Sequence, residues 1–383
     1  MNQIRILLIT YNYPPGGGVG SIRASKFAKY LPDQWNIHVL TAADNIGPNT
    51  DISIDDGGNV TVHEVSEFLP NSPKEFNKIR WVPPLCWKIR QLHERYSFDA
   101  IWHTAGPFLP LLSTVVITSS VEVPYLVDFR DAWTLQPYRP KRTVFGQMHD
   151  VVSTSAEPRI LRRATAVTTA TSGITRAYQN RYPELSSKFK TVENGYDPDD
   201  FPDVDVEQPN RFTIVYVGKF GHYRDVAPFL RALADIKTET GVQFVHVGEP
   251  EQDVVSTVAE FGLADQFTCT GFVDRSAVAR HIHRADLGLA VSGGSPQEMT
   301  TKIFDYIACE TPILACGPSA GAMAEVVSQF DHGYVTENEF PAIEAALSDI
   351  VATDPRSLGE GPYAEYTREQ AGEKLAEIVL EAV

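Results

Sequence analysis

The chain has 383 residues, which is long for one ordinary hydrophobic core and therefore predicts two domains. Hydrophobic residues make up 43% and charged residues 21%, as in a typical soluble globular protein. The net charge of −16 excludes an ordinary nucleic-acid binder, because residues 1–205 hold 21 Lys and Arg against 22 Asp and Glu, and residues 206–383 hold 12 against 27. The four cysteines form no CxxC pair, no metal-ligand spacing occurs, and no apolar run could span a membrane, so we expect a cytoplasmic protein without a metal.

Apolar runs alternate with amphipathic segments along the first half of the chain. This pattern predicts buried parallel strands at 4–9, 37–40, 100–102, 125–129, 166–169 and 191–193. Helices are predicted between them at 21–31, 85–96, 109–119, 146–163 and 173–181. A polar, acidic and proline-bearing segment at 197–209 then predicts a linker.

The second half repeats the alternation. Strands are predicted at 212–217, 243–247, 267–270, 287–290, 313–315 and 333–335. Helices are predicted at 226–238, 252–261, 275–283, 301–309, 320–330, 341–353 and 365–382. We therefore expect an α/β fold of two Rossmann-like domains whose parallel sheets face each other across a cleft. The expected divisions are 1–200, 201–364 and a C-terminal helical segment, 365–383.

A glycine-rich loop follows the first predicted strand. It reads Tyr-Asn-Tyr-Pro-Pro-Gly-Gly-Gly-Val-Gly from residue 11 and places glycines where backbone can approach a ligand, at Gly16, Gly17, Gly18 and Gly20. No register gives Gly-x-Gly-x-x-Gly, which weakens a nicotinamide interpretation. Arg23, one turn into the next helix, either faces an anion or is a solvated helix residue.

Charged residues also follow the strand predicted at 125–129. Asp128, Arg130 and Asp131 stand beside Trp133, at the strand end where such folds place polar chemistry. The alternative is an ion pair between Arg130 and an aspartate that fixes a loop. His103 ends a neighbouring strand and is either a site residue or a packed histidine.

The segment Gly218-Lys219 to Arg224 carries the strongest pattern in the chain. A strand, a glycine turn, two cations and a helix start occur in succession. Backbone N–H groups, the helix dipole and side-chain charge together suit a diphosphate, and the alternative is two surface cations.

A second turn into a helix carries further candidate donor-binding residues. Thr301 and Lys302 begin the helix, and Asp305 lies one turn in, where it can accept two ribose hydroxyls. Gln297 or Glu298 would lie near a sugar on the diphosphate. After another strand, Phe272 and Val273 could line a base pocket, and the alternative for all of these is simple cap, loop and surface chemistry.

These motifs together resemble the retaining glycosyltransferases of family 4, which have the GT-B fold. Lys219 with Arg224 resembles the cation pair that holds the pyrophosphate of the family's sugar donor. The run from Lys302 to Pro312 resembles the Lys-Leu-Phe-Glu-Tyr-Met-Ala signature, 194–197 resembles an Asn-Gly-Val-Asp turn, and 128–133 resembles a motif of polysaccharide-building members. Two departures are Gln297 and Asp305, where the family has glutamates, and another is Arg130, where many members have histidine.

The resemblance implies transfer of a sugar from a nucleoside-diphosphate sugar to a glycan or lipid-linked acceptor, with no metal or other cofactor. It implies that the glycine loop closes over the phosphates, that Lys219 and Arg224 stabilise the departing diphosphate, and that the last helix returns to the first domain. The residues expected on the acceptor side are Arg130, Asp131 and His103, which would orient the acceptor hydroxyl, with Arg23, Asp128 and Trp133. The alternatives are a sugar-nucleotide 2-epimerase of the same fold and a non-catalytic nucleotide-sugar-binding subunit.

Basic clusters in the first half raise the question of membrane contact. They comprise Arg80, Lys88, Arg90 and Arg95; Arg139, Lys141 and Arg142; and Arg159, Arg162 and Arg163. They are either solvated helix faces or a patch that rests on anionic lipid headgroups at the inner face of the membrane.

Overall fold

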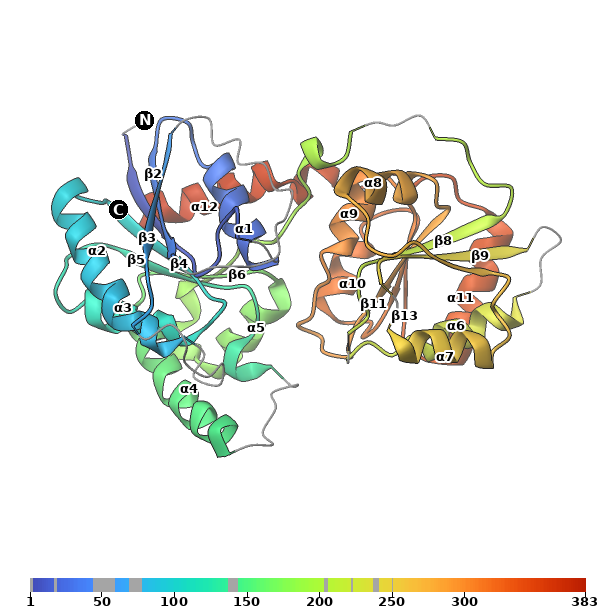
Figure 1. Cartoon of the computed structure of the whole chain (residues 1–383), viewed down its shortest axis with the longest axis horizontal. Coiled ribbons are helices and arrows are strands. Elements are labelled where there is room, and N and C mark those ends of the chain that lie inside the picture. Colours follow the sequence, from blue (N-terminus) through green and yellow to red (C-terminus); the bar gives the residue numbers. More distant parts are fainter. Residues whose placement is uncertain are drawn as a thin grey trace. The chain divides into compact units, whose positions relative to one another are not determined.

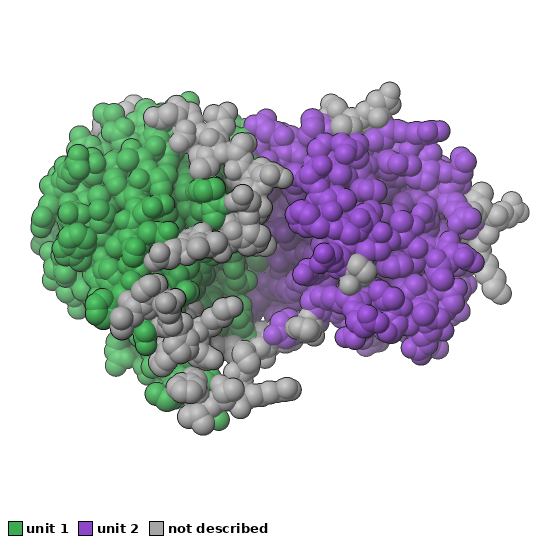
Figure 2. Space-filling model, viewed as in Figure 1, with its two compact units in different colours: residues 1–193, 368–383 green, residues 194–367 purple. Residues whose placement is uncertain are grey.

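The protein was analysed as a computed structural model, which describes residues 3–16, 19–43, 59–68, 78–136, 144–202, 206–221, 223–236, 241–249 and 251–383. The chain divides into two compact units. Unit 1 comprises Met1–Glu193 with Arg368–Val383, and unit 2 comprises Asn194–Thr367 (Figure 2). The C-terminal helix is therefore part of the unit that contains the N-terminus.

Unit 1 is built on a parallel sheet. Among its described residues, seven strands pair in the order β3-β2-β1-β4-β5-β6-β7. They are β1 (Arg5–Ile9), β2 (Asn36–Ala42), β3 (Val60–Val65), β4 (Ala100–Thr104), β5 (Tyr125–Phe129), β6 (Val167–Thr169) and β7 (Phe189–Thr191). The helices are α1 (Val19–Tyr30), α2 (Val82–Tyr96), α3 (Leu112–Ile117), α4 (Val144–Arg163), α5 (Ser172–Arg181) and α12 (Arg368–Ala382) (Figure 1).

Strand alternation gives unit 1 two hydrophobic layers. Along β1, Ile6 and Leu8 join one core with α1 and α12, whereas Leu7 and Ile9 join another with α2, α3, α4 and α5. Both faces of the central strand are thus buried, as expected for a parallel sheet between helical layers.

The last helix packs very closely on the first. A Cβ on Gly372 of α12 would stand 2.6 Å from the carbonyl oxygen of Tyr30, at the end of α1. A residue without a side chain is required for this approach. Leu375 and Val379, both fully buried, complete the contact with the unit 1 core.

Unit 2 repeats the arrangement with a smaller sheet. Within the described part of unit 2, six strands pair in the order β10-β9-β8-β11-β12-β13. They are β8 (Phe212–Val217), β9 (Val242–Val247), β10 (Phe267–Cys269), β11 (Leu287–Val291), β12 (Ile313–Cys316) and β13 (Gly333–Thr336). The helices are α6 (Ala227–Asp235), α7 (Gln252–Glu260), α8 (Arg275–His283), α9 (Lys302–Ala308), α10 (Ala322–Val327) and α11 (Phe340–Thr353).

The central strand of unit 2 also feeds two cores. Val215 of β8 packs with α8, α9 and α10, whereas Ile214 and Tyr216 pack with α6, α7 and α11. Each unit therefore has its own hydrophobic layers on both faces of its own sheet, which is the basis for independent stability.

The prediction of an α/β fold with two parallel Rossmann-like sheets is confirmed. One strand was missed: β3 is an edge strand whose residues are only partly buried, so its sequence lacks a continuous apolar run. Another is displaced, since β7 lies at Phe189–Thr191 rather than at 191–193. In the segment expected to be a linker, Asp197 and Phe201 are buried in unit 2.

None of the helices that the structure describes is both long and apolar enough to pass through a membrane.

Candidate functional site

Two loops of unit 2 that carry predicted donor-binding residues lie where the strand order of its sheet reverses. β8 runs to β9 on one side and to β11 on the other, so the loops after β8 and β11 leave the carboxyl edge of the sheet at its switch point. These loops carry Gly218–Arg224 and Ser292–Thr301, respectively. Unit 1 has the same reversal between β1 and β4.

The turn after β8 is fixed by hydrogen bonds. Gly218 has a φ of +82°, a conformation that favours glycine. Its N–H donates to the carbonyl of Val247 at 2.7 Å, and its carbonyl accepts from Nε2 of the buried His246 at 2.6 Å. Burial lowers the pKa of His246, so the ring acts as a neutral anchor for this turn. His246 was not predicted, because a strand-interior histidine carries no sequence signal of its own.

Lys302 lies beside the same turn. A Cβ added to Gly218 would stand 3.8 Å from Nζ of Lys302, and this ammonium also lies 4.8 Å from the centroid of the Tyr216 ring. Burial and, to a smaller extent, the charge of Arg224 together lower the pKa of Lys302 to about 8, against the opposing effect of the Asp305 and Glu298 carboxylates. A partly buried cation next to the turn that follows β8 is well suited to receive an anion.

Arg224 reaches the loop after β11 through Glu298. Its Nη2 donates to Oε1 of Glu298 at 2.6 Å, and Nη1 donates to the carbonyl of Phe220 at 3.3 Å. Oε2 of Glu298 accepts from the N–H of Gly293 at 2.6 Å. Glu298 thus holds the guanidinium and the second glycine loop in one arrangement, across 74 residues of sequence.

Asp305 is paired with an arginine that was not predicted. Nη2 of Arg275, the first residue of α8, donates to Oδ1 of Asp305 at 2.9 Å. Arg275 also stacks over Phe201 at 4.4 Å from the ring centroid. An ion pair between two helices cannot be recognised from the sequence, because 30 residues separate the partners.

The other predicted donor-binding residues of unit 2 lie on the same carboxyl edge. Lys219 follows Gly218 directly, and its carbonyl accepts from Oη of Tyr216 at 2.9 Å. Phe272 is 88% exposed after β10, and Val273 is half-buried against the core. Gln297 is half-buried in the loop after β11, and Thr301 is exposed immediately before α9. Their roles stay predictions.

Two of the predicted acceptor-side residues form a buried ion pair in unit 1. Nε and Nη2 of Arg23 donate to the two carboxylate oxygens of Asp128 at 2.9 and 2.8 Å, and neither side chain is more than 2% exposed. The carboxylate also accepts from the hydroxyls of Thr104 and Thr168, both at 2.7 Å. Arg23 also donates to the carbonyl of Val192 at 2.8 Å. The Arg23–Asp128 pair therefore connects α1 and β5 to the segment that follows β7.

Arg130 does not pair with Asp128. Its Nε and Nη2 donate to Oδ2 of the neighbouring Asp131 at 3.2 and 3.1 Å, and Arg130 is 25% exposed. The guanidinium lies against two glycines: Cβ atoms added to Gly20 and Gly106 would stand 3.2 Å from Nη1 and 3.6 Å from Nη2. The structure thus brings the glycine loop and the charged end of β5 together.

His103 and Trp133 are buried in the core of unit 1, as in the packed alternative for His103, and their acceptor-side roles stay predictions. His103 is 1% exposed, and its Nδ1 lies 2.9 Å from Oη of Tyr125, with Oγ of Ser113 at 3.3 Å. Burial lowers the pKa of His103 to about 3, so the ring is neutral at pH 7. Trp133 is 1% exposed and stacks on Phe108 with centroids 5.3 Å apart.

Of the glycine loop, Gly17 and Gly18 lie outside the described residues. Gly16 follows β1 and is buried, and Gly20 lies in the first turn of α1. Their contact with a ligand stays a prediction.

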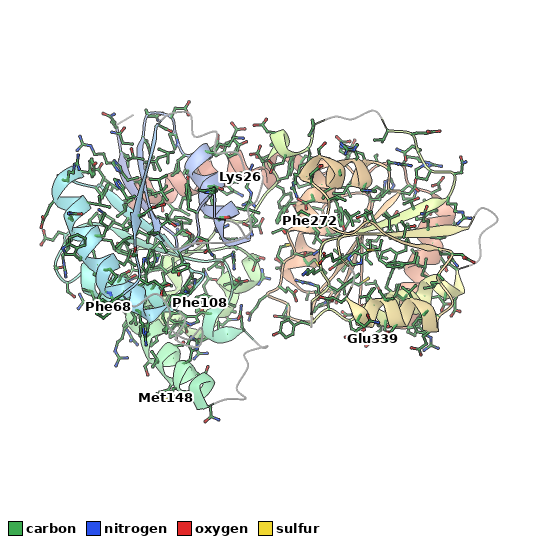
Figure 3. The ribbon with its side chains drawn as sticks, in the orientation of Figure 1. Lys26, Phe68, Phe108, Met148, Phe272 and Glu339 are labelled. Carbon is green, nitrogen blue, oxygen red and sulfur yellow. The ribbon has the colours of Figure 1, made fainter. Side chains whose placement is uncertain are left out.

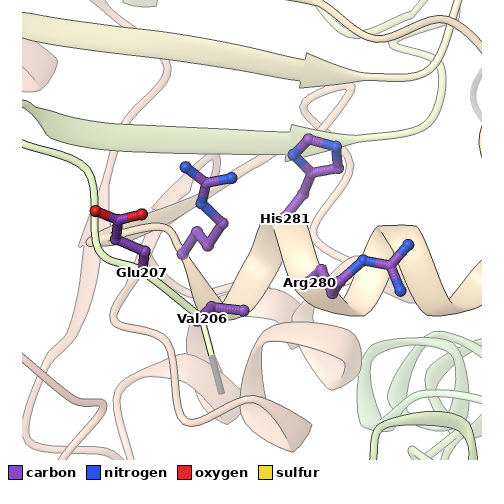
Figure 4. Close-up of a pocket in the computed structure, with 5 residues that line it drawn as sticks. Val206, Glu207, Arg280 and His281 are labelled. Atoms are coloured by element: carbon purple, nitrogen blue, oxygen red, sulfur yellow. The ribbon is translucent and has the colours of Figure 1, made fainter. Parts of the chain in front are cut away.

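A surface hollow in unit 2 is distinct from these residues. It is lined by Val206, Glu207, Arg280, His281 and Arg284 (Figure 4). These residues precede β8 or lie at the end of α8, so the hollow is on the side of the amino ends of the strands. Ligands of parallel sheets bind beyond the carboxyl ends, which favours the switch-point cluster over this hollow.

Most of unit 2 matches a family of known proteins. Residues 199–365 match the family model described as "Glycosyl transferases group 1". This part of the chain is similar to group 1 glycosyl transferases. It includes helix α9 and the loops after β8 and β11, which carry Lys219, Arg224, Glu298, Lys302 and Asp305.

Individual relatives extend the comparison. The chain is 26% identical over 264 residues to 2-deoxystreptamine glucosyltransferase of Streptomyces kanamyceticus, a match that covers 65% of this chain and 67% of that protein. Among solved structures, sucrose-phosphate synthase of Thermosynechococcus elongatus aligns over 99% of both chains, with a TM-score of 0.76 and 17% identity. Anabaena Alr3699/HepE, solved with UDP and glucose, aligns over 99% of this chain and 100% of that chain, with a TM-score of 0.67 and 17% identity. These structural likenesses concern the fold.

Proposed function

We propose that the protein transfers a sugar from a nucleoside-diphosphate sugar to an acceptor hydroxyl, with retention of anomeric configuration, as a family 4 glycosyltransferase. The observation that carries the proposal is the cluster of Arg224, Lys302, Glu298 and Asp305 at the switch point of unit 2. It lies within the segment that matches the family model of group 1 glycosyl transferases. UDP in Anabaena Alr3699/HepE, which has the same fold, gives the donor class further support.

In this proposal, charge stabilisation provides the largest part of catalysis. The sugar becomes oxocarbenium-like while negative charge develops on the departing diphosphate. Arg224 and Lys302 would stabilise that charge from fixed positions, since Glu298 holds Arg224 and burial holds Lys302 against Gly218. Lys219 would add a third cation from the turn itself. These three cations would replace a metal ion, and we propose that transfer continues in excess EDTA.

Asp305 would hold the ribose of the donor. Arg275 donates to its Oδ1 at 2.9 Å and to its Oδ2 at 3.5 Å, which orients the carboxylate, and the remaining lone pairs of the two oxygens could accept hydroxyl hydrogen bonds. Glu298 fixes Arg224 and would also stand close to the donor sugar. It would thereby take the role of the family's glutamate, whose position in this chain is occupied by Gln297.

Unit 1 would bind the acceptor, a glycan or a lipid-linked sugar. Arg130 and Asp131 are partly exposed charged residues at the end of β5, and Arg130 rests on Gly20 and Gly106. We assign acceptor orientation to these two. The buried Arg23–Asp128 pair would position the surrounding loops without touching the acceptor, because both partners are satisfied inside the protein.

The first experiment is a thermal-shift screen with UDP, GDP and dTDP sugars, followed by a transfer assay with the stabilising donor. Arg224→Ala, Lys219→Ala and Lys302→Ala should each reduce kcat/KM by about 10²- to 10³-fold, because each removes charge from the diphosphate site. The matched control is Arg211→Ala, an exposed arginine at the opposite end of β8, which should retain full activity. If the three variants keep wild-type turnover, the proposed donor site is wrong.

The products distinguish the alternatives. Proton NMR of the transferred sugar should show the same anomeric configuration as the donor, and an inverted product would contradict retention. Incubation with donor alone tests the epimerase alternative, because an epimer would form without any acceptor. Tight nucleotide binding without transfer to any acceptor fraction of a cell extract would instead favour a non-catalytic binding subunit.

A further inference from the structure

Helix α4 exposes an apolar surface that the proposed transfer reaction does not use. Met148, Val151 and Val152 are 56%, 68% and 40% exposed, respectively, in the N-terminal half of the helix. Figure 3 shows Met148 at the outer end of α4, away from the rest of unit 1. None of these three side chains belongs to a hydrophobic cluster of the described residues, and such an exposed apolar group is typical of a contact surface.

The same face continues as a basic surface. Arg159 and Arg162 are exposed and follow the apolar group at helical spacing, since positions 148, 152, 155, 159 and 162 recur every three or four residues. We call Met148, Val151, Val152, Arg159 and Arg162 the α4 stripe. It runs for about 21 Å along the helix at 1.5 Å per residue.

The charge of the α4 stripe is not neutralised within the described part of the chain. Nη1 of Arg159 donates to the carbonyl of Ser155, and Nη1 of Arg162 donates to that of Pro158 at 3.5 Å. These are backbone contacts, and no carboxylate among the described residues forms an ion pair with either arginine. Arg163, next in the chain, is also exposed.

The acidic residues of α4 lie away from the stripe. Glu157 is fully buried, where it accepts hydrogen bonds from the hydroxyls of Thr134, Tyr178 and Tyr182 at 2.7, 2.8 and 2.9 Å. Asp150 is offset from Met148 and from Val152 by two residues, which places it on another side of the helix. The outward face of α4 is therefore apolar and basic, without an acidic side chain among its described residues.

We propose that α4 is a docking helix that lays the α4 stripe on an anionic lipid bilayer. The apolar half would enter the headgroup region and the arginines would pair with lipid phosphates, which is the combination that an interfacial helix requires. Charge complementarity favours a bilayer over a second copy of this chain, because two copies meeting through this face would bring their arginines together. The proposal concerns binding to lipid only and holds whether or not the protein transfers sugar.

The surrounding charges orient the molecule on such a surface. Unit 2, residues 194–367, holds 10 Lys and Arg against 28 Asp and Glu and would be repelled by anionic lipid. Helix α3 packs on α4, and α2 packs on α3; these neighbours expose Val116 and Trp87. The helical layer of unit 1 that contains α4 thus offers the surface for contact (Figure 1).

The test is co-sedimentation of the full-length protein, without any substrate, with vesicles of phosphatidylcholine alone or with about 30% phosphatidylglycerol. We expect binding to the anionic vesicles only, and its loss in about 0.5 M NaCl. Two double variants test the two halves of the α4 stripe. The variant Met148→Glu/Val151→Glu disrupts the apolar half, and Arg159→Gln/Arg162→Gln removes the charge of the basic half. Each should weaken vesicle binding at least about tenfold. Circular dichroism melting curves identify any variant that fails to fold.

Matched controls use exposed residues of unit 2. Val255→Glu removes a valine that is 41% exposed, and Arg280→Gln/Arg284→Gln removes two exposed arginines; neither should change vesicle binding. Equal binding to both kinds of vesicle, or wild-type binding by both folded α4 variants, would overturn the proposal. It would also fail if light scattering showed a dimer that Met148→Glu/Val151→Glu converts to a monomer, since the face would then be a self-association surface.

Discussion

Lys302 carries a buried charge whose energetic cost the bound ligand would offset. Its pKa of about 8 lies below the ordinary value of 10.5, so the unfolded chain holds this proton more tightly than the folded protein. The charge therefore opposes folding below pH 8, and this opposition disappears as the pH rises from 8 toward 10.5. A diphosphate at the same place would reverse the effect by stabilising the ammonium.

Lys302→Met should separate stability from binding. We expect the variant to be more stable than wild type at pH 7, by on the order of 1–2 kcal/mol, because it removes the buried charge. It should also lose most of its UDP affinity, and urea unfolding with isothermal titration calorimetry measures both quantities. In the wild type, UDP affinity should fall by up to about tenfold per pH unit above pH 8. A pH-independent affinity between pH 7 and 9 would contradict the assignment of Lys302 to the diphosphate site.

Asp128 and Asp131 should differ sharply although only three residues separate them. Asp128→Ala leaves Arg23 buried without its carboxylate and should lower the free energy of unfolding by about 3–5 kcal/mol. Asp131→Ala removes the partner of a partly exposed arginine and should cost less than about 1 kcal/mol. Urea unfolding followed by tryptophan fluorescence compares the two variants. Similar losses in both would show that the buried pair is not what stabilises this part of unit 1.

Among elements, α9 is positioned by a single glycine. A Cβ on Gly288 of β11 would stand 2.6 Å from the Tyr306 ring, whose hydroxyl donates to the carbonyl of Leu289 at 3.0 Å. Tyr306 thereby fixes the height of α9 above the sheet, and Lys302 and Asp305 lie on the same helix. The positions of Lys302 and Asp305 thus depend on the contact between Gly288 and the Tyr306 ring.

Gly288→Ala should affect both packing and binding. The added methyl group overpacks the Tyr306 site, and we expect a loss of about 1–3 kcal/mol in stability together with weaker UDP binding, because α9 must shift. Tyr306→Leu in the same chain should restore part of the stability, and a double-mutant cycle measures this coupling. Additive effects of the two substitutions would show that the ring contact does not position α9.

The sequence predicted most elements and missed those with weak local signals. Long apolar runs such as β8 and β11 were located closely, because both of their faces are buried. The partly buried edge strand β3 was missed. In the site, Lys302, Asp305 and Glu298 were predicted from their motif, whereas Arg275 and His246 were not. Those two act through contacts with residues 28 or more positions away, which no local pattern records.

At the scale of the whole molecule, the two units have separate cores and should unfold separately. UDP binds unit 2 in our proposal, so it should raise the temperature of one calorimetric transition and leave the other unchanged. Leu375→Ala in α12 should lower the temperature of the other transition. We expect the free energy of unfolding of unit 1 to fall by about 2–5 kcal/mol, because this fully buried leucine packs in the unit 1 core. The matched control is Leu380→Ala in the same helix, which is 48% exposed and should change stability by less than about 0.5 kcal/mol. One transition that UDP and Leu375→Ala both shift would contradict independent units.

The sequence by itself determined the fold class and the location of the motif that we propose binds a diphosphate. Both follow from local patterns: apolar runs of strand length alternate with helical spacing, and a glycine turn with cations stands between a strand and a helix. Tertiary structure alone decided which partner each charge takes. Asp128 pairs with Arg23 across 105 residues, Arg224 with Glu298 across 74, and Arg130 with its neighbour Asp131. The partner of a charged group depends on which side chains folding brings within hydrogen-bond distance and out of water, and a linear pattern does not contain that information.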